Sequence, residues 1–488
     1  MSQATLHHRA PQIQSEPARA PAVGVAFAAI VLAMLPAVLD QTILATALPV
    51  IAGDLGSLTD VSWVVTAYVV AAAATTPLWG KLGDRIGRKL LLEVALLAFV
   101  LASALCGTAQ DITQLIVLRA VQGAAAGGLM TLAMAAVGDL VAPRERGRYQ
   151  GYIAATFAAA TIVGPLIGGV LVDHASWRWV FLVNLPIGAA ALAGLHLRLP
   201  APEAAGADRA LDVAGAALLA GATTALMLTC IWGGSRYAWD SALIVALIAA
   251  AIVLSGALLV RERRAADPIV PLHLLRTGPV AIASAALFLA TAALFSVTVF
   301  VPLFLETTTG ASPTEAGLLL VPAMLGIAVS TTLSGRSIVR TGRYKRFPIA
   351  GLALMTAALV LLAAVAGDPS QVTTGVALAV FGLGFGMVTQ VLIVAVQNSV
   401  ERRELGVATA TTGFFRALGG AVGAAVLGAV FAAQAGAHAT DGIAHAVRAD
   451  VIDGVQAVFL VAAPLAALAL LVVLRLPELP LQTADHKS

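Results

Sequence analysis

Asp40 is a carboxylate inside a long apolar run, in the stretch LDQTILATALP from Leu39 to Pro49. An Asp at the centre of a membrane-spanning helix costs roughly 2.5–3.5 kcal/mol on insertion scales, so it is expected to face the interior of a bundle or a water-filled cavity. Because its insertion is unfavourable, the carboxylate is expected to have a function, and we expect it to bind and release a proton. The alternative is a packing role, in which Thr42 or a backbone group holds the carboxylate.

Arg119 and Gln122 lie in another apolar run, LIVLRAVQGAAAGG. At about 1.5 Å of rise per residue, Asp40 and Arg119 lie at similar depths, roughly 12 Å and 9 Å below the outer ends of their helices. Because Arg keeps its proton at neutral pH, its role would be to hold or tune the carboxylate. The sequence therefore predicts an Asp40–Arg119 pair, although Arg119 could instead extend to the outer membrane surface.

These residues are embedded in a chain of membrane composition. Of 488 residues 59% are apolar and 11% are charged, whereas soluble domains have about 25% charged residues. Apolar runs of spanning length recur along the chain. We predict an all-α polytopic membrane protein with fourteen spans, at 23–48, 61–80, 90–108, 113–136, 151–172, 180–198, 211–232, 240–260, 279–305, 313–334, 347–366, 372–396, 406–432 and 452–474.

The distribution of positive charge supports this assignment. Lys and Arg collect in cytoplasmic loops, and with both termini cytoplasmic only Arg178, Arg236 and Arg448 fall outside. Arg119 and Arg416 lie within spans, which leaves 24 of the 29 basic residues inside. The net charge of +3 therefore has a topological explanation, and no nucleic-acid partner is expected.

A short basic motif occurs twice. GKLGDRIGRK, from Gly80 to Lys89, returns as GRSIVRTGRYK from Gly335 to Lys345. The matching positions are Gly80, Lys81, Arg85, Gly87 and Arg88 in the first copy and Gly335, Arg336, Arg340, Gly342 and Arg343 in the second. We interpret both copies as basic loops on the cytoplasmic side, which places two halves of the chain in the same orientation.

The duplication also sets the domain organisation. If each half has six spans, the halves are 23–198 and 279–474, and two spans are left over as an inserted hairpin at 211–260. Residues 261–278 form a basic connector, while 1–22 and 475–488 are cytoplasmic tails. We expect the hairpin to be peripheral; the alternative is that it lines the substrate path.

The run GPLIGG combines a potential hinge with small residues. Gly164 and Gly168 are one helical turn apart, so they allow another helix to approach closely. Pro165 removes a backbone hydrogen bond and can bend the span. With Gly169, these residues predict a packing and hinge surface.

Taken together, these motifs resemble the signatures of the major facilitator superfamily, and more narrowly of its fourteen-span drug:proton antiporter branch. The resemblance implies the major facilitator fold and proton-coupled export of drugs or other lipophilic or cationic small molecules, with a role in antibiotic resistance. It also implies a monomer in the bacterial inner membrane. Another facilitator activity, such as export of a dedicated endogenous metabolite or nutrient symport, is the alternative. Further residues matching that branch are Trp177, Arg178, Trp179, Phe181, Asn184, Pro186, Gly188 and the run from Phe415 to Gly420.

The resemblance assigns roles to particular residues. It implies proton coupling by Asp40 and Arg119. It further implies a conformational charge network formed by Gly80, Asp84, Arg85, Gly87 and Arg88, and an antiport hinge formed by Gly164, Pro165, Gly168 and Gly169. Asp84 and its basic neighbours could instead be a solvated loop.

This sequence departs from the family pattern in two places. Ala45 stands where the family usually has Asn, which removes one possible hydrogen-bonding group near Asp40. In the second basic motif Val339 replaces the acid, so only the first half is expected to form the charge network.

Other polar residues in the spans are candidates for the substrate cavity. An unpaired charge in the membrane is costly, so Arg416 must be paired or face water. Glu306 could recognise a cation, join proton transfer or be a solvated interfacial residue. We expect Gln122, Glu306, Gln390 and Arg416 to line the cavity.

The sequence points away from catalysis. It contains no GxxxxGK[ST] motif and hence no sign of an internal ATPase. Cys106 and Cys230 have no Cys or His at metal-ligand spacing. We expect a transporter driven by a proton gradient, without cofactor or metal.

Overall fold

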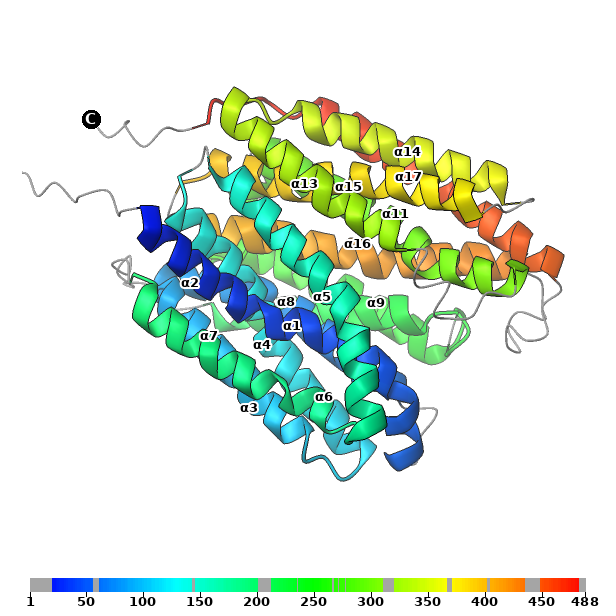
Figure 1. Cartoon of the computed structure of the whole chain (residues 1–488), viewed down its shortest axis with the longest axis horizontal. Coiled ribbons are helices and arrows are strands. Elements are labelled where there is room, and N and C mark those ends of the chain that lie inside the picture. The colour runs from blue at the N-terminus through cyan, green and yellow to red at the C-terminus, as the bar shows by residue number, and fades with distance from the viewer. Residues whose placement is uncertain are drawn as a thin grey trace, which may run out of the picture.

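The computed structural model describes residues 20–55, 61–142, 145–200, 212–234, 236–265, 267–270, 272–276, 278–309, 320–366, 371–401, 404–434 and 448–481. These residues form a helical bundle in which the earlier and later helices make two adjacent groups (Figure 1). The helices are α1 (Ala20–Leu55), α2 (Val61–Ile86), α3 (Arg88–Cys106), α4 (Ile112–Leu140), α5 (Arg146–His174), α6 (Trp179–Leu182), α7 (Asn184–Arg198), α8 (Val213–Trp232), α9 (Ala242–Arg264), α10 (Leu272–Arg276), α11 (Gly278–Thr309), α13 (Val321–Thr341), α14 (Arg346–Val365), α15 (Gln371–Ser399), α16 (Leu405–Gln434) and α17 (Arg448–Leu474).

The helices follow the predicted spans closely. Within the described ranges, thirteen spans are long and apolar enough to cross a membrane. The predicted span 313–334 corresponds in part to α13, whose stretch from Ser330 to Arg336 is polar, while residues 310–319 lie outside the described ranges. An all-helical membrane protein is therefore confirmed, and a fourteenth crossing at α13 stays a prediction.

The basic motifs are turns between helices rather than the loops expected from the sequence. α2 continues to Ile86 and α3 begins at Arg88, so Gly87 alone separates them, with a φ of 110°. In the second copy α13 ends before Gly342, whose φ is 69°. Glycine adopts positive φ without a Cβ clash, so the two copies share a backbone requirement as well as charges.

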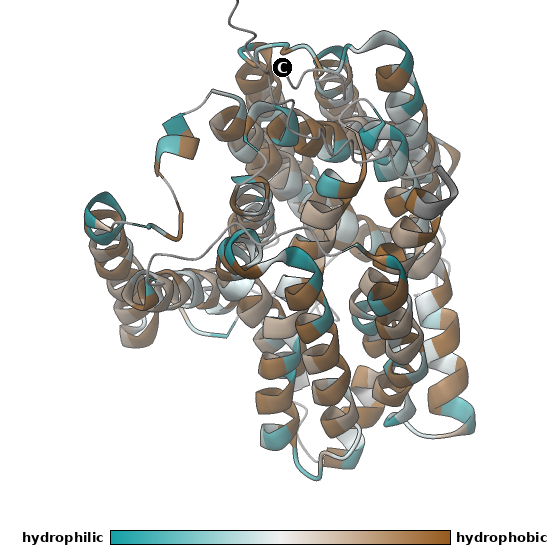
Figure 2. Cartoon of the chain, turned by 90° about the vertical axis from the view of Figure 1, so that its left-hand side faces the viewer, coloured by the Kyte–Doolittle hydropathy of each residue, from teal (hydrophilic) through white to brown (hydrophobic). Residues whose placement is uncertain are grey.

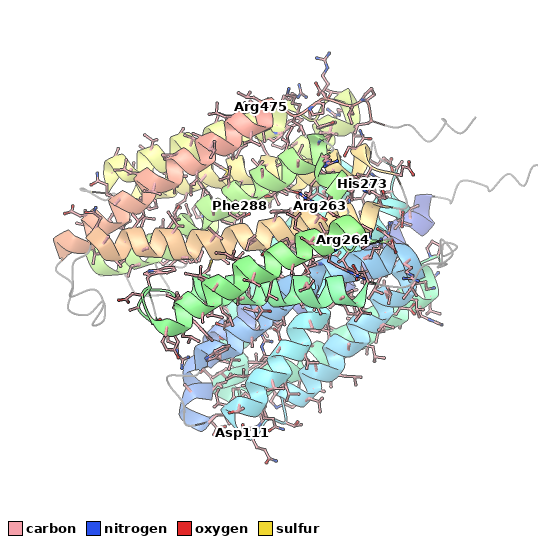
Figure 3. The ribbon with its side chains drawn as sticks, turned by 180° about the vertical axis from the view of Figure 1, so that it is seen from behind. Asp111, Arg263, Arg264, His273, Phe288 and Arg475 are labelled. Carbon is pink, nitrogen blue, oxygen red and sulfur yellow. The ribbon has the colours of Figure 1, made fainter. Side chains whose placement is uncertain are left out.

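Both ends of the described chain lie at one end of the bundle, where α2 is followed by α3 and α13 by α14 (Figure 1). The turns at Gly87 and Gly342 are therefore at this end, which we call the basic end. Figure 2 looks onto this end and shows hydrophobic residues along the helices, with hydrophilic residues mainly at their tips. Arg263, Arg264 and His273 lie toward the basic end, and Asp111 lies at the opposite end (Figure 3). The molecule thus has the polar ends and apolar sides of a membrane protein.

Each half has its own packed interior. In the first half, large buried residues such as Phe99 and Met34 belong to a cluster that also contains Tyr68. In the second half, Phe381 and Phe459 belong to a separate cluster. The predicted inserted hairpin, α8 and α9, packs its first helix against α2 and α16, and the rings of Trp63 and Trp232 are 4.6 Å apart.

Part of the predicted C-terminal tail is packed against the second half. The Tyr344 hydroxyl donates to the carbonyl of Pro477 at 3.1 Å and accepts from the Leu479 N–H at 2.9 Å. The Asn398 amide donates to the carbonyl of Pro480. Burial raises the pKa of the Tyr344 hydroxyl, so this anchor is neutral at physiological pH.

Candidate functional site: a buried ion pair and a central cavity

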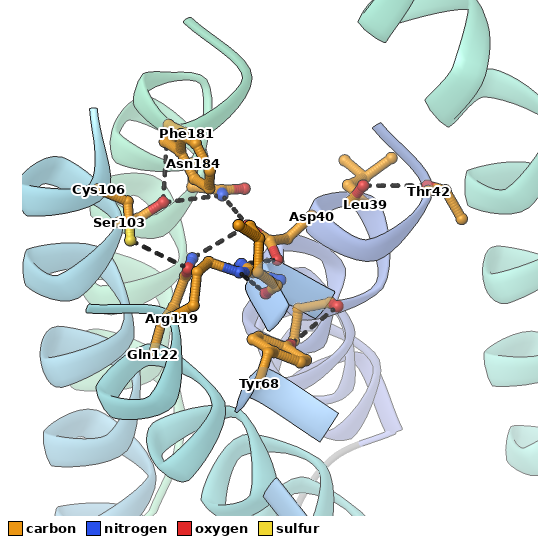
Figure 4. A network of polar contacts seen from close by, with 12 residues as sticks. Leu39, Asp40, Thr42, Tyr68, Ser103, Cys106, Arg119, Gln122, Phe181 and Asn184 are labelled. Atoms are coloured by element: carbon orange, nitrogen blue, oxygen red, sulfur yellow. Dashed lines mark hydrogen bonds and ion pairs between the residues drawn. The ribbon is translucent and has the colours of Figure 1, made fainter. Parts of the chain in front are cut away.

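The structure brings Asp40 and Arg119 together in the interior of the first half (Figure 4). Arg119 Nη1 donates to Asp40 Oδ2 at 2.5 Å, and Gln122 Nε2 donates to Asp40 Oδ1 at 3.0 Å. Asn184 Nδ2 is 3.4 Å from the same Oδ1 and donates to Ser103 Oγ at 3.0 Å. Asp40 is 0% exposed and Arg119 1% exposed, so neither charge contacts bulk water.

Arg119 is held by more than the carboxylate. Its Nε donates to the carbonyl of Val64 at 3.1 Å, and Nη1 also reaches Gln122 Oε1 at 2.6 Å. The guanidinium lies over the Tyr68 ring, 4.2 Å from its centroid, an arrangement that favours a cation. Charge-assisted hydrogen bonds of this kind are about twice as strong as neutral ones, so the arginine is firmly positioned.

Local sequence features put these groups in place. α4 begins after Asp111, whose side chain accepts from the Gln114 N–H at 2.8 Å and caps the helix. A Cβ at Gly123 would lie 2.6 Å from the Tyr68 Cα, so only glycine lets α4 approach α2 this closely. That approach sets the Arg119 guanidinium over the Tyr68 ring.

The predicted hinge residues pack α5 against the helix that carries Asp40. A Cβ on Gly164 would clash with Thr42, coming within 2.6 Å of its Cβ, and one on Gly168 would lie 2.8 Å from the Ile43 carbonyl. Gly169 is different, because its Cβ would have nothing within 4 Å. Pro165 is exposed within α5. Two of the four residues therefore make the α1–α5 contact.

The first basic motif contacts the second half. Asp84 accepts from the backbone N–H groups of Gly406 and Val407, at 2.9 Å and 2.7 Å, in the first turn of α16. Arg88 Nη2 donates to Asp84 at 2.5 Å, and Arg88 also pairs with Asp139. A carboxylate at a helix N-terminus satisfies free N–H groups and complements the helix dipole.

The remaining residues of this motif have distinct positions. A Cβ on Gly80 would lie 2.8 Å from the Gly406 carbonyl, so α2 and α16 meet backbone to backbone. Arg85 is half-buried at the end of α2, and Lys81 pairs with Asp267 of the connector. The motif thus joins the first half to both the second half and the connector.

The second half repeats the backbone contact without the acid. Gly335 lies against the backbone of Gly147 in the first turn of α5, as Gly80 does against α16. Val339 occupies the position that corresponds to Asp84, so it supplies no carboxylate to that turn. Instead, Arg146 donates to the carbonyl of Gln397 at 3.1 Å and Gln397 donates to that of Met134 at 3.2 Å, again joining the halves at the basic end.

A smaller cluster ties down the opposite end of α1. Asp54 accepts from the Trp177 indole at 2.8 Å and from Arg178 at 3.2 Å. These hydrogen bonds hold the pKa of Asp54 below its usual range. The Trp177-Arg178 pair noted in the sequence therefore anchors the helix that carries Asp40.

A cavity of about 430 Å³ lies between the two halves. Helices α1, α2, α4 and α5 of the first half and α11, α13, α15 and α16 of the second half line it. Its described lining contains no residue of the hairpin. The polar side chains of the lining are Gln41, Tyr68, Thr76, Thr131, Thr161, Thr331, Thr389, Gln390, Thr409, Thr412 and Arg416.

The predicted cavity residues separate into three groups. Gln390 and Arg416 line the cavity. Gln122 is absent from this lining, because its amide is used by Asp40 and Arg119. Glu306 lies near the end of α11, and its side chain falls outside the described set.

Sequence reasoning missed several members of these networks. Tyr68 and Ser103 are ordinary residues of membrane helices, and nothing in their spacing shows that they meet Arg119 or Asn184. Gln397 gave a usable signal, since it is an amide inside an apolar span. Asp139 gave another, because it is an acid within the positively charged inner region of the chain.

The family profile described as Major Facilitator Superfamily matches residues 30–424. The chain belongs to the major facilitator superfamily. That superfamily is one of transporters rather than enzymes, and the buried pair and central cavity lie within its fold.

Two relatives illustrate the likeness within the superfamily. An uncharacterised facilitator of Mycobacterium tuberculosis is 40% identical over 405 residues, which cover 83% of this chain and 59% of that protein. The multidrug transporter MdtP of Bacillus subtilis is 35% identical over 412 residues, covering 84% of this chain and 76% of MdtP. The chain thus spans less than two thirds of the mycobacterial relative's length.

A solved structure shows the same fold. The crystal structure of the human organic anion transporter MFSD10 superposes with a TM-score of 0.67, covering 92% of this chain and 99% of that one. At 18% sequence identity, the likeness concerns the fold alone.

Proposed function

We propose that this facilitator is a proton-coupled antiporter that exports lipophilic small molecules from the bacterial cytoplasm, and that Asp40 is its proton-binding group. The observation that carries the proposal is the Asp40–Arg119 pair, whose members are at most 1% exposed and lie beside the cavity. Gln41, the neighbour of Asp40, and Tyr68, the ring under Arg119, both line that cavity. Relatives named a multidrug transporter and an efflux pump support the substrate class and the direction.

In this proposal the basic end is cytoplasmic, because Lys and Arg accumulate on that side of membrane proteins. Contacts of Asp84 with α16 and of Arg146 with Gln397 join the halves there. The structure then corresponds to a state closed to the cytoplasm. Export requires these contacts to open so that substrate can enter from the inside.

Proton binding at Asp40 removes the ion pair but leaves Arg119 supported. The Val64 carbonyl and Gln122 Oε1 still accept from the guanidinium, so the arginine keeps its place while the carboxyl group becomes neutral. Substrate leaves to the outside while Asp40 takes up a proton. The protein then returns the proton to the cytoplasm as it reopens the basic end.

The test uses inverted membrane vesicles, in which the cytoplasmic face is outward. Respiration acidifies the interior, which an acridine dye reports, and candidate substrates of both charges and of none are then added. An exported substrate should dissipate the acidity in vesicles with the wild-type protein. Asp40→Asn, which keeps the shape but cannot ionise, should abolish this response.

Asp173→Asn is the matched control, because Asp173 is an exposed carboxylate at the other end of α5. It should respond like the wild type. An Asp40→Asn protein that dissipates the gradient at the normal rate would overturn the coupling role. Accumulation of substrate on the cytoplasmic side with proton movement in the same direction would replace antiport by symport.

A further inference from the structure

The described lining of the central cavity contains a positively charged side chain and no negatively charged one. Among its described lining residues, Arg416 is the only one that carries a charge near neutral pH. Arg416 lies in the middle of α16 and is exposed, which at this position means exposed to the cavity. No hydrogen bond or ion pair joins it to another described residue.

Asp84, a carboxylate on the basic side, is too far along the bundle to pair with it. Asp84 is fixed to the N–H group of Val407. From Val407 to Arg416 the helix rises by about 14 Å. Asp84 and Arg416 are therefore separated by more than two helical turns.

Asp40 lies on the other side of Arg416 and is already paired. Gly413 of α16 is level with Thr76 of α2, while the Asp40–Arg119 pair is level with Val64. Along α2, Val64 lies about 18 Å further from the basic end than Thr76, whereas Arg416 lies only about 4.5 Å beyond Gly413. The remaining axial separation is about 13 Å.

Glu306 is also excluded by its position in α11. Gly419 of α16 lies against Phe288 of α11, part-way along the bundle (Figure 3). Glu306 follows Phe288 by about 27 Å of helix rise. None of these three residues shares the helical level of Arg416, and no ion pair joins Arg416 to another described residue. A cation within the bundle therefore faces the cavity with its charge unbalanced.

We propose, on the basis of the transport function above, that the cavity selects amphipathic organic anions, whose carboxylate, sulfonate or phosphate group pairs with Arg416. A guanidinium forms bidentate hydrogen bonds with these groups, and its attraction is stronger in a cavity than in bulk water. Phe157, Phe385, Met130 and Met324 supply apolar surface for the rest of the molecule. Lipophilic cations, the class that the sequence resemblance implied, are repelled by the same charge.

The cavity lining holds a second polar group without a hydrogen-bond partner. Gln390 Oε1 is buried and has no hydrogen-bond partner among the described residues. A hydroxyl or N–H group on the substrate would satisfy it. The preferred ligand is thus an anion that also carries a hydrogen-bond donor.

The test measures equilibrium binding to the purified full-length protein in detergent, without a gradient. Fluorescein and rhodamine 123 share a xanthene core but are anionic and cationic at about pH 7.5, and fluorescence anisotropy reports their binding. The wild type should bind fluorescein at least about tenfold more tightly than rhodamine 123. Arg416→Gln should remove this preference, and Arg416→Lys should retain most of it.

Arg264→Gln is the control, because Arg264 is an exposed arginine at the basic end, outside the cavity. It should leave both affinities unchanged. Tighter binding of rhodamine 123 by the wild type, or an unchanged preference in a folded Arg416→Gln protein, overturns the inference. The wild-type comparison decides the question even if Arg416→Gln does not fold.

The vesicle assay separates this inference from the function on which it rests. If rhodamine 123 but not fluorescein dissipates the gradient in an Asp40-dependent way, proton-coupled export stands and anion selection is wrong. If fluorescein binds through Arg416 but moves no protons, anion selection stands and the coupling role fails.

Discussion

Asp84 and Val407 are joined across the boundary between the two halves, with the Val407 N–H donating to the Asp84 carboxylate at 2.7 Å. The same carboxylate holds Arg88 from its own half. One side chain therefore links an ion pair of the first half to the first turn of a helix in the second. Opening the basic end requires this link to break.

Asp84→Ala should open the basic end. Hydrogen bonds to a charged group contribute about 1.5–3 kcal/mol each, so losing both N–H contacts should shift the equilibrium between conformations at least about tenfold. A cysteine at Thr409, which lines the cavity near this end, reports the change through labelling from the basic side in a Cys230→Ser background. Asp173→Asn should not increase labelling, and equal labelling of Asp84→Ala and the parent would contradict the locking role.

Gly164→Val should impair transport much more than Gly169→Val. A side chain at Gly164 meets Thr42, while one at Gly169 meets nothing within 4 Å. Overpacking typically costs about 1–3 kcal/mol, and here it pushes α5 away from the helix that carries Asp40. Transport rates and thermal stability of the two variants, at equal expression, check the difference. Equal transport rates and stabilities of the two variants would mean that close α1–α5 packing is not needed for transport.

Gly87→Ala and Gly342→Ala should each lower stability without blocking any contact. Neither position has an atom within 4 Å of the added Cβ, but both have positive φ. Such sparsely populated backbone conformations cost a residue with a Cβ on the order of 1–3 kcal/mol. Gly256→Ala, in open space within α9, is the control and should be neutral or slightly stabilising. Thermal unfolding in detergent measures all three.

Asp40→Asn should destabilise the protein more than Arg119→Gln. Without Asp40 the buried guanidinium cannot lose its proton and remains charged, and an uncompensated buried charge costs about 3–5 kcal/mol. Without Arg119 the carboxyl group can become neutral by taking up a proton. The double variant should recover part of the Asp40→Asn loss, as chemical or thermal unfolding would show. Additive effects in the double variant would mean that the two residues do not act as a pair.

The sequence was most informative where an unusual residue stood in a uniform background. Apolar runs placed most helix ends to within a few residues, although α1, α2 and α13 continue six or seven residues beyond their predicted ends. The isolated charges of Asp40 and Arg119 predicted that these two residues pair. Glycines at equal offsets in GKLGDRIGRK and its second copy predicted the duplication. The loop predicted for that motif was wrong, because α2 continues through its charged residues to Ile86 and the chain turns at Gly87 alone.

Contacts that depend on how helices rotate and cross could not be predicted from one sequence. Gln122 was expected in the cavity, but its helix turns it toward Asp40. The partnership of Asp84 with the first turn of α16 involves backbone N–H groups, which leave no trace in residue type. The isolation of Arg416 likewise emerged only from the relative levels of α2, α11 and α16.

The buried ion pair is assembled by helices of the first half alone, namely α1, α2, α3, α4 and α7, whereas Arg416 comes from α16. Under the roles proposed above, proton coupling and substrate selection can evolve separately in a protein built this way. Substitutions in α15 and α16 can change which molecules are accepted while Asp40 and Arg119 stay the same. Lineages that share the first-half motifs can therefore diverge in the compounds that they transport.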